Sequence, residues 1–421
     1  MDFFTLEAVP ARYGDCLLLH YGTPAAPGLM LIDGGPSRVW PKFLEPRLKA
    51  LKAARGAGFR IELMMVSHID DDHVLGLVDL TGAWKEEKNA GRPWPYPVKD
   101  AWFNSFERIS NAKDINAVTA SVTASAGASS WDEIDVDRPE ITNDNKDEAQ
   151  AALKVLASVG NGKELRDDLE ALKVPTNRGF AGKLVRPGEG PEVPFKLGPE
   201  LTLHVVAPLA AQLEALQKMF AKDLKPEAAL AAYTDGSVPN LSSVAAVARF
   251  KGKTILLTGD ARGDYLIEGL KAEGLLDAGG KLHLDILKMP HHGSDRNVDP
   301  SFFSTITADH YVASADGTFG NPDRPTLEML VDRRGKAANY TIHLTYPLAE
   351  IDARRKDEWE KDRQGEIDKK KAKIRPPWNH ATDDLAALFK QKQDEGFAFT
   401  VSAPAAAGQS AKVELLDAIP F

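Results

Sequence analysis

The sequence predicts a mixed α/β fold with four layers, in which two β-sheets pack together and helices cover their outer faces. Short apolar runs typical of strands occur in two batches, one before about residue 105 and one after about residue 195. Segments with apolar residues at helical spacing lie among the strands of both batches. This alternation fits two sheets that share one core and carry helices outside. A chain of 421 residues with 43% hydrophobic residues can bury such a core.

The first batch begins with three strands that turn signals separate. DFFTLEAV, CLLLHY and GLMLID are short apolar runs, with YGD and TPAAPG between them, which predicts an antiparallel start. PKFLEPRLKALKAA, residues 41–54, is a predicted helix. IELMMV, residues 61–66, is a fully apolar strand, and a second helix is predicted to start directly after His73.

The middle of the chain is less regular. DAWFNSF and LTLHVVAP are predicted core strands. Between them lie a polar stretch, residues 111–148, and a predicted helix near 146–172. We interpret residues 105–195 as an insertion that lies over or beside the functional site.

The second batch resumes near residue 240. SSVAAVARF and KTILLTGD are predicted to form a hairpin across KGK, and LDILKMP, HYVASAD and NYTIHLTYP are predicted strands with helices between them. The charged residues 352–375 indicate a solvated helix, and the last two apolar runs indicate a terminal hairpin. We therefore expect one large domain over residues 1–350, and a charged helix and terminal hairpin over 351–421 packed on it.

Composition excludes several classes of protein. The net charge of −9 gives no overall positive field for nucleic acid or anionic membrane. The single cysteine, Cys16, rules out an intrachain disulfide and a cysteine-rich zinc site. The N-terminus lacks the layout of a signal peptide, and no apolar run approaches the ~20 residues that span a bilayer. We expect a cytoplasmic protein without a membrane partner; the sequence leaves its oligomeric state open.

The heptapeptide SHIDDDH, residues 67–73, follows a buried strand directly. It places His68, Asp70, Asp72 and His73 where the strand gives way to a helix, so their side chains can converge on one point. Imidazole and carboxylate groups are the ligands of Zn²⁺ and Mn²⁺. A helix N-terminus rich in aspartate is the alternative, and it accounts for the acidic residues but not for the two histidines that bracket them. The segment therefore predicts a metal site.

Three other strands end in residues of the same chemical types. Asp33 ends GLMLID, Asp260 ends KTILLTGD, and the pair His291–His292 follows LDILKMP. Each alone is also compatible with an ordinary turn. Because sites in α/β folds gather at the ends of strands, four such ends together predict one shared metal site.

In this order the motifs LIDGG, SHIDDDH, LLTGD and LKMPHHGS resemble the metallo-β-lactamase superfamily. They are most similar to its ComEC-type branch, the hydrolase domain attached to the bacterial DNA-uptake channel. In that branch the usual HxHxDH motif has the form HxDxDH. Asn240 and Ser243 in NLSS match an Asn-x-x-Ser segment of that branch, whereas Asn321 stands where the branch has a histidine. The resemblance spans residues 3–85 and 195–335.

The resemblance implies an αββα metallo-β-lactamase-like sandwich with one or two divalent ions. It implies that His68 and Asp70 serve the first metal position, that Asp260 bridges, and that Asp33 supports the ligands. Three side chains would serve the second position: Asp72, His73 and one of the pair His291 and His292, a choice that stays open. Since the first position has few nitrogen ligands, we expect Mn²⁺ to compete with Zn²⁺ there.

A metal-dependent hydrolase is the expected function, most readily a phosphodiesterase or nuclease acting on nucleic acid or nucleotides. A bound divalent ion lowers the pKa of water to roughly 7, and two ions can hold both the attacking and the leaving oxygen. Besides Asp72, the expected catalytic residues are Lys288, Asn240 and Ser243; Lys288 would stabilise developing negative charge unless it is a solvated lysine. Ser294 and Arg296 are further candidates for contacts with phosphate.

Two alternatives stay open. The same metal chemistry would serve a lactone, ester or amide hydrolase, since a fold does not fix a substrate. A metal-binding scaffold without turnover is the other. The acidic net charge argues against tight non-specific binding of DNA, which depends on lysine and arginine, and less against a nucleotide.

Overall fold

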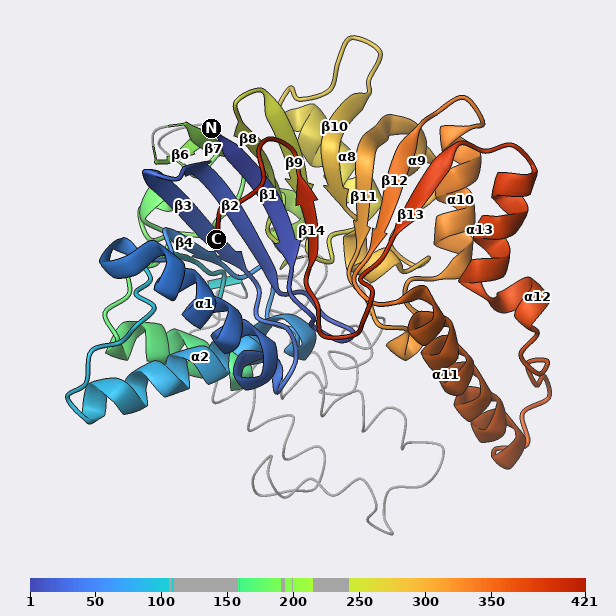
Figure 1. The fold of residues 1–421 in the computed structure, drawn as a ribbon, viewed down its shortest axis with the longest axis horizontal. Helices are drawn as coiled ribbons and strands as arrows, with labels where there is room; N and C mark the ends of the chain where they lie inside the picture. Colours follow the sequence, from blue (N-terminus) through green and yellow to red (C-terminus); the bar gives the residue numbers. More distant parts are fainter. Residues whose placement is uncertain (106–107, 110–157, 159, 191–193, 199, 215–241) are drawn as a thin grey trace.

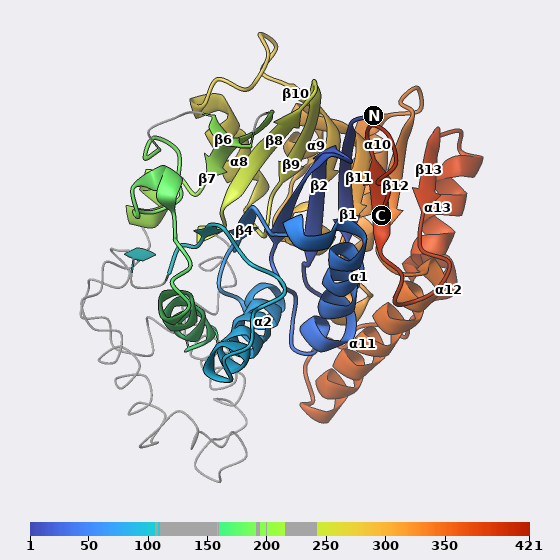
Figure 2. The same cartoon turned by 60° about the vertical axis from the view of Figure 1, so that its left-hand side comes forward.

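Two β-sheets face each other and helices lie on their outer sides (Figure 1). The structure is a computed structural model that describes residues 1–105, 108–109, 158, 160–190, 194–198, 200–214 and 242–421. Turned by 60°, the molecule shows the helices α1 and α2 near the first sheet and α10 and α13 near the second (Figure 2). The predicted four-layer α/β sandwich is confirmed.

The first sheet has six strands. Their spatial order is β14 (Ala411–Glu414), β1 (Phe3–Ala8), β2 (Leu17–Thr23), β3 (Ala26–Ile32), β4 (Leu63–Met65) and β5 (Ala101–Trp102). The pairs β1–β2 and β2–β3 are antiparallel, as expected, and β3, β4 and β5 are parallel. Because β3 and β4 run in the same direction, the residues that follow them leave the sheet at the same edge.

The second sheet has eight strands. Their spatial order is β13 (Phe399–Ser402), β12 (Tyr340–Leu344), β11 (Ile306–Ala313), β10 (Leu282–Lys288), β9 (Lys253–Leu257), β8 (Ala245–Phe250), β7 (Leu201–Ala207) and β6 (Phe195–Leu197). The predicted hairpin is confirmed as β8–β9, and the strands from β9 to β13 are parallel. The turns after β9 and β10 therefore also share one edge.

The predicted terminal hairpin is wrong. Strand β13 pairs with β12 in the second sheet, whereas β14 pairs with β1 in the first. The two strands thus close different sheets instead of pairing with each other. Each covers an edge that would otherwise expose unpaired backbone groups.

The helices fill the two outer layers. A π-helical turn, Trp40–Leu44, continues into α1 (Glu45–Arg55), and the others are α2 (Asp71–Asn89), α8 (Gly263–Ala272), α9 (Pro300–Thr305), α10 (Arg324–Arg334), α11 (Leu348–Asp368), α12 (His380–Asp383) and α13 (Leu385–Asp394). Short 3₁₀ turns lie at Gly56–Gly58, Arg178–Phe180, Pro290–Gly293 and Thr318–Gly320. Residues 160–171 are helical, within the predicted helix near 146–172, and the rest of the expected insertion up to residue 157 lies almost wholly outside the described residues. No helix in the described part of the chain is long and apolar enough to cross a membrane.

Three apolar layers hold the sandwich together. Leu19, Met65 and Ile286 belong to the layer between the two sheets. The outer layers are centred on residues such as Leu77 of α2 and Leu330 of α10. Burial of these side chains is the main driving force that fixes the sheets relative to each other.

The sequence predicts a solvated helix over residues 352–375, but helix α11 is buried in part. Its first half is partly buried at Ile351, Asp352 and Arg355. The guanidinium of Arg355 donates hydrogen bonds to the carbonyl oxygens of Gly320 (3.0 Å) and Asp383 (2.8 Å). These bonds tie α11 to the turn Thr318–Gly320 and to α12.

Candidate metal centre

The predicted ligands meet where turns from the two sheets approach each other. Asp33 follows β3, and the segment from His68 to His73 joins β4 to α2. Asp260 follows β9, and His291 and His292 follow β10 in the second sheet. Each strand ends where its apolar run ends, so the polar residues that follow lie beyond the carboxyl ends of the strands. The sequence thus brings ligands from four strand ends to one place.

Backbone contacts fix the first turn of α2. The carbonyl oxygen of Asp72 accepts from the N–H of Asp15 (3.2 Å), and that of His73 accepts from the N–H of Gly34 (2.7 Å). A Cβ at Gly76 would lie 1.9 Å from the carbonyl oxygen of Gly34, so only glycine permits this approach. The helix begins at Asp71, three residues earlier than predicted, and His73 therefore lies inside its first turn.

Asp33 orients His73. Its Oδ2 lies 2.8 Å from Nδ1 of His73, and its two oxygens also accept from the N–H (2.7 Å) and the hydroxyl (2.6 Å) of Ser67. A carboxylate can only accept, so Nδ1 of His73 carries a proton and Nε2 is the nitrogen that a metal could use once it displaces any proton there. This is the hydrogen bond that histidine ligands of metals typically make through their second nitrogen.

Three further imidazoles are held in the same way. Nδ1 of His292 lies 3.0 Å from the carbonyl oxygen of Ser314, and Nδ1 of His291 lies 2.7 Å from Oδ1 of Asn297. Nδ1 of His68 lies 3.0 Å from the hydroxyl of Ser67, whose own proton goes to Asp33. All four rings therefore donate through Nδ1 and leave Nε2 as the nitrogen available to a metal.

The four Nε2 atoms turn towards one carboxylate, that of Asp260. Its Oδ1 lies 3.3 Å from Nε2 of His73 and 3.5 Å from that of His292. Its Oδ2 lies 3.6 Å from Nε2 of His291 and 3.8 Å from that of His68. Asp260 thus stands between two pairs of imidazoles, with one oxygen facing each pair.

The other two aspartates of the heptapeptide flank these pairs. Oδ2 of Asp70 lies 3.6 Å from Nε2 of His68, and Oδ2 of Asp72 lies 3.4 Å from Nε2 of His292. Asp71 instead points away and accepts from the amide of Asn161 (2.9 Å). Asp70 and Asp72 are thus placed among the candidate ligands and Asp71 is not.

The centre is strongly negative. Burial lowers the pKa of His73, but the carboxylates of Asp260 and Asp72 outweigh it and raise that pKa well above its ordinary value. His292 is affected in the same sense, with its pKa raised to about 9 against the effect of burial. The negative charge that stabilises protons on these buried imidazoles would also stabilise a metal cation, and the cation would replace those protons.

These residues fit a divalent cation. Nε2 of His68 and Oδ1 of Asp260 are buried and have no hydrogen-bond partner among the described residues, a costly state for polar atoms unless an ion satisfies them. One set of donor atoms, from Asp15, His73, Asp260 and His292, lies within 4.8 Å of one another, as does a second set from His68, Asp72 and His73. Nitrogen and oxygen donors of this kind suit zinc or manganese.

The turn that carries His291 and His292 is strained. Both residues have left-handed backbones, with φ of 46° and 56°, which side chains with a Cβ rarely adopt. Such a conformation costs on the order of 1–3 kcal/mol per residue and is typical of functional sites. The strain directs both rings towards Asp260, so the structure brings together both histidines between which the sequence did not choose.

Asp15 is a functional candidate that the sequence did not reveal. It is buried in the turn between β1 and β2, and it pairs with Nζ of Lys288 (2.6 Å) and with Nδ1 of His292 (3.4 Å). Ser314 donates a further hydrogen bond to it. The only signal in the sequence is an acidic residue between two apolar strands, which also describes an ordinary turn.

Lys288 is neither solvated nor open to the cavity. Its side chain is fully buried, and its amine also donates to the carbonyl oxygen of Met289 (3.0 Å). The charge of Lys288 therefore acts on the centre through Asp15. Its direct action on a substrate stays a prediction.

The segment NLSS is described only in part. Asn240 lies outside the described residues. Ser243 is buried, and its hydroxyl has no hydrogen-bond partner in the described part of the chain. A Cβ at Gly259 would lie 3.5 Å from the Cβ of Ser243, which places this serine beside the turn that carries Asp260.

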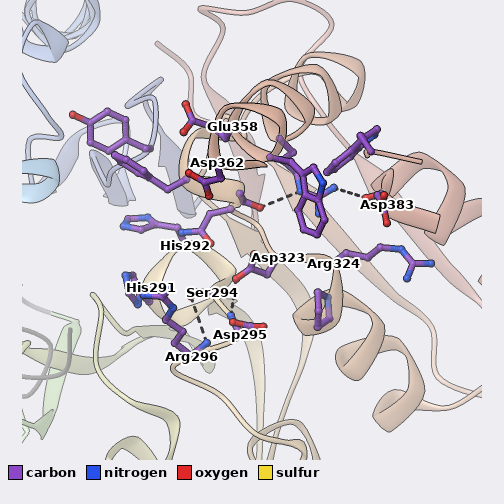
Figure 3. A pocket seen from close by; sticks show the side chains of 18 of the residues that line it. His291, His292, Ser294, Asp295, Arg296, Asp323, Arg324, Glu358, Asp362 and Asp383 are labelled. Carbon is purple, nitrogen blue, oxygen red and sulfur yellow. Dashed lines mark hydrogen bonds between the residues drawn. The ribbon is translucent and has the colours of Figure 1, made fainter. Parts of the chain in front are cut away.

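A cavity of about 710 Å³ opens beside the centre. Asp72, His291 and His292 lie in its wall, together with the predicted phosphate contacts Ser294 and Arg296. Figure 3 shows His291, His292 and Arg296 on one side of this space and Asp383 and Arg324 on the other. The candidate centre is thus accessible to a small substrate.

Comparison with known proteins supports the superfamily in the part of the chain that contains the heptapeptide. Residues 14–153 match the metallo-beta-lactamase superfamily. The crystal structure of the metallo-beta-lactamase fold protein YhfI from Bacillus subtilis is 12% identical and covers 97% of this chain and 100% of that chain, with a TM-score of 0.35. No curated protein matches the sequence, and the ComEC-type branch stays a prediction.

Proposed function

We propose that the protein is a metal-dependent hydrolase that cleaves a phosphodiester of a nucleotide or of a short nucleic-acid end. The observation that carries the proposal is the set of four imidazoles whose Nε2 atoms face the two oxygens of Asp260. Buried donor atoms of this kind destabilise the folded protein until an ion binds them. The stability of the fold therefore does not explain why they are there. The match to the metallo-beta-lactamase superfamily supports hydrolysis as its use.

Zn²⁺ or Mn²⁺ would be held by the two pairs of imidazoles, with Asp260 between them. His68 and His291 face one oxygen of Asp260, and His73 and His292 face the other. Asp70 lies beside His68, and Asp72 lies beside His292. When bound, a divalent cation lowers the pKa of coordinated water and so supplies a nucleophile at neutral pH. Asp33, Asn297 and Ser314 keep the imidazoles in the ligating tautomer.

The cavity supplies groups for a single phosphate. Arg296 is exposed and forms no ion pair within the described residues, so its guanidinium can meet a phosphate oxygen. Glu358, Asp362 and Asp383 lie in other parts of the same wall and would repel a long polyanion. The balance favours a nucleotide or a strand end over the middle of a duplex. The ComEC-type resemblance supports the phosphodiester itself.

A hydrolase of lactones, esters or amides is the second candidate. The carboxylates in the cavity wall favour it, because an uncharged substrate would not be repelled. A metal-binding scaffold without turnover would leave the geometry unchanged, and only an activity measurement separates it from the two enzymes.

The test combines elemental analysis with an activity panel. Protein loaded with Mn²⁺ or Zn²⁺ is assayed on a chromogenic phosphodiester, a cyclic nucleotide, single-stranded DNA and a lactone. We expect hydrolysis of the phosphodiesters, and its loss in His73→Ala and Asp260→Asn. His283→Ala is the matched control, since His283 is an exposed histidine at the opposite end of β10. Turnover of the lactone alone, or metal binding without any turnover, would refute the proposal.

A further inference from the structure

A second cavity opens at the end of the first sheet opposite to the candidate metal centre. Its volume is about 450 Å³, within the range of sites that bind small molecules. Gly28 near the start of β3 and Glu62 just before β4 line it, whereas the candidate metal ligands follow the carboxyl ends of these strands. Among the described residues, none lines both cavities. A ligand bound here would therefore be separate from the metal centre.

Arg55, the last residue of α1, brings a partly buried positive charge to this cavity. Its guanidinium lies over the rings of Phe59 and Phe421, 5.7 and 4.9 Å from their centroids. Nη2 donates to the carbonyl oxygen of Gly28 (3.1 Å), but Nη1 is buried and has no hydrogen-bond partner among the described residues. Burial lowers the pKa of Arg55 to about 10, and no described carboxylate forms an ion pair with it. Such a charge is costly to bury, and an anion in the cavity would supply the missing partner.

The hydroxyl of Tyr21 is a second polar group in this wall that lacks a partner. Tyr21 lines the cavity but is only 4% exposed, and its oxygen has no hydrogen-bond partner in the described part of the chain. Burial raises the pKa of Tyr21, so the hydroxyl stays protonated and can donate. The ring packs on Gly28, where a Cβ would lie 2.2 Å from Cζ, the carbon that carries the hydroxyl. Since Arg55 is bonded to the same glycine, both donors adjoin one point of the wall.

The remaining charged side chains give the cavity an excess of positive charge. Arg60 and Lys99 line it, and both pair with Glu62, which is the single acidic side chain among its described lining residues. Three cationic side chains, counting Arg55, thus stand against one carboxylate in a chain whose net charge is −9. A local reversal of the overall charge attracts small anions to this end of the molecule.

We propose that this cavity binds a small organic anion whose carboxylate or phosphate group is held by Arg55 and Tyr21. Guanidinium N–H groups match the oxygens of either group, and the phenol adds a further donor. Because both donors are buried, side chains of the wall shift as the anion enters; those of Arg60 and Lys99 are exposed and can move. The body of the ligand meets an apolar surface formed by Pro24, Ala25, Ala26, Pro27 and Ala54. This site does not depend on the proposed reaction.

The experiment measures binding of benzoate, phenyl phosphate and uncharged benzamide to the full-length protein by calorimetry, with metal present and after chelation. We expect saturable binding of one or both anions with one site per chain, equal in the two conditions, and no binding of benzamide. Which anion binds identifies the charged group. Arg55→Met should abolish this binding, and Tyr21→Phe should weaken it about 10- to 100-fold, because each removes a donor to a charged acceptor.

Tyr265→Phe is the matched control, since Tyr265 of α8 also has an arginine over its ring (4.9 Å); it should leave anion affinity unchanged. Tyr21→Phe keeps the shape of the wall and decides the matter if Arg55→Met does not fold. Without an anion its melting temperature should stay equal or rise, because no hydrogen bond is lost, whereas a structural hydroxyl predicts a fall. Absence of saturable binding, equal binding of benzamide, binding that requires the metal, or unchanged affinity in Tyr21→Phe would overturn the proposal.

Discussion

Replacing Asp33 by asparagine is expected to weaken metal binding while the fold stays intact. Oδ1 of Asp33 accepts from the N–H of Ser67, and Oδ2 faces Nδ1 of His73. Only oxygen can accept from that N–H, so the new amide group must place its NH₂ opposite His73. The imidazole then accepts at Nδ1 and carries its proton on Nε2, the nitrogen that faces Asp260. A protonated Nε2 cannot coordinate a metal.

The expected loss is about 10- to 100-fold in affinity for Zn²⁺ or Mn²⁺, which corresponds to about 1.4–2.7 kcal/mol. Asparagine also tolerates the left-handed backbone of residue 33, whose φ is 56°, so no new strain arises. Competition with a chromophoric chelator at neutral pH measures the dissociation constant. Urea unfolding of the metal-free protein shows that the variant is folded.

The matched control is Asp168→Asn. Asp168 is equally buried, but it accepts from Thr81 (2.8 Å) and Lys85 on the far part of α2. That variant should lose some stability and keep its metal affinity. An unchanged dissociation constant in folded Asp33→Asn would refute the tautomer reasoning.

Three further predictions concern the buried titratable side chains of Glu7, Lys288 and His343. Glu7→Gln should remove about 3 kcal/mol of unfolding free energy at pH 7. Burial raises the pKa of Glu7, but hydrogen bonds from an imidazole and a guanidinium outweigh burial and lower that pKa from 4.5 to about 2. That contribution is present above pH 4.5 and lost as the pH falls to about 2, so urea unfolding of the wild type should lose stability over this range more steeply than the variant. Lys288→Met should cost about 3–5 kcal/mol because it strands the buried Asp15 carboxylate, and adding Asp15→Asn should recover part of the loss; a double variant less stable than the single one would contradict this. Burial lowers the pKa of His343 from 6.5 to about 4, so the folded state loses up to about 3 kcal/mol as the pH falls across that range, and His343→Phe should flatten the fall in melting temperature between pH 7 and 4.

The ends of the apolar strands were predictable because their signal is local. An apolar run that stops at Asp33, Ser67 or Asp260 fixes both the strand and the place where polar side chains emerge. Parallel neighbours then share an edge, and the ligands converge without any further information.

Features that depend on distant partners were not predictable. The runs of β13 and β14 carry the period of strands, but nothing in them says which sheet each joins, and nearness in sequence favoured the wrong hairpin. Charged residues make up most of α11, so its sequence does not distinguish the buried Arg355 from its exposed neighbours. The burial of Arg355 depends on its hydrogen bonds to carbonyl groups of a turn and of α12. Asp15 could not be distinguished from a turn residue because Lys288 and His292 lie far along the chain.

The candidate centre also joins the two halves of the sandwich. Asp33 and the heptapeptide belong to the first sheet, whereas Asp260 and the histidine pair belong to the second. A cation held by both would act as a removable crosslink across the core, and at a hundredfold excess over its dissociation constant it would add about 2.7 kcal/mol to the stability of the folded chain. Chelators should therefore loosen the contact between the sheets, and the melting temperature should report how full the centre is, even before any substrate is known.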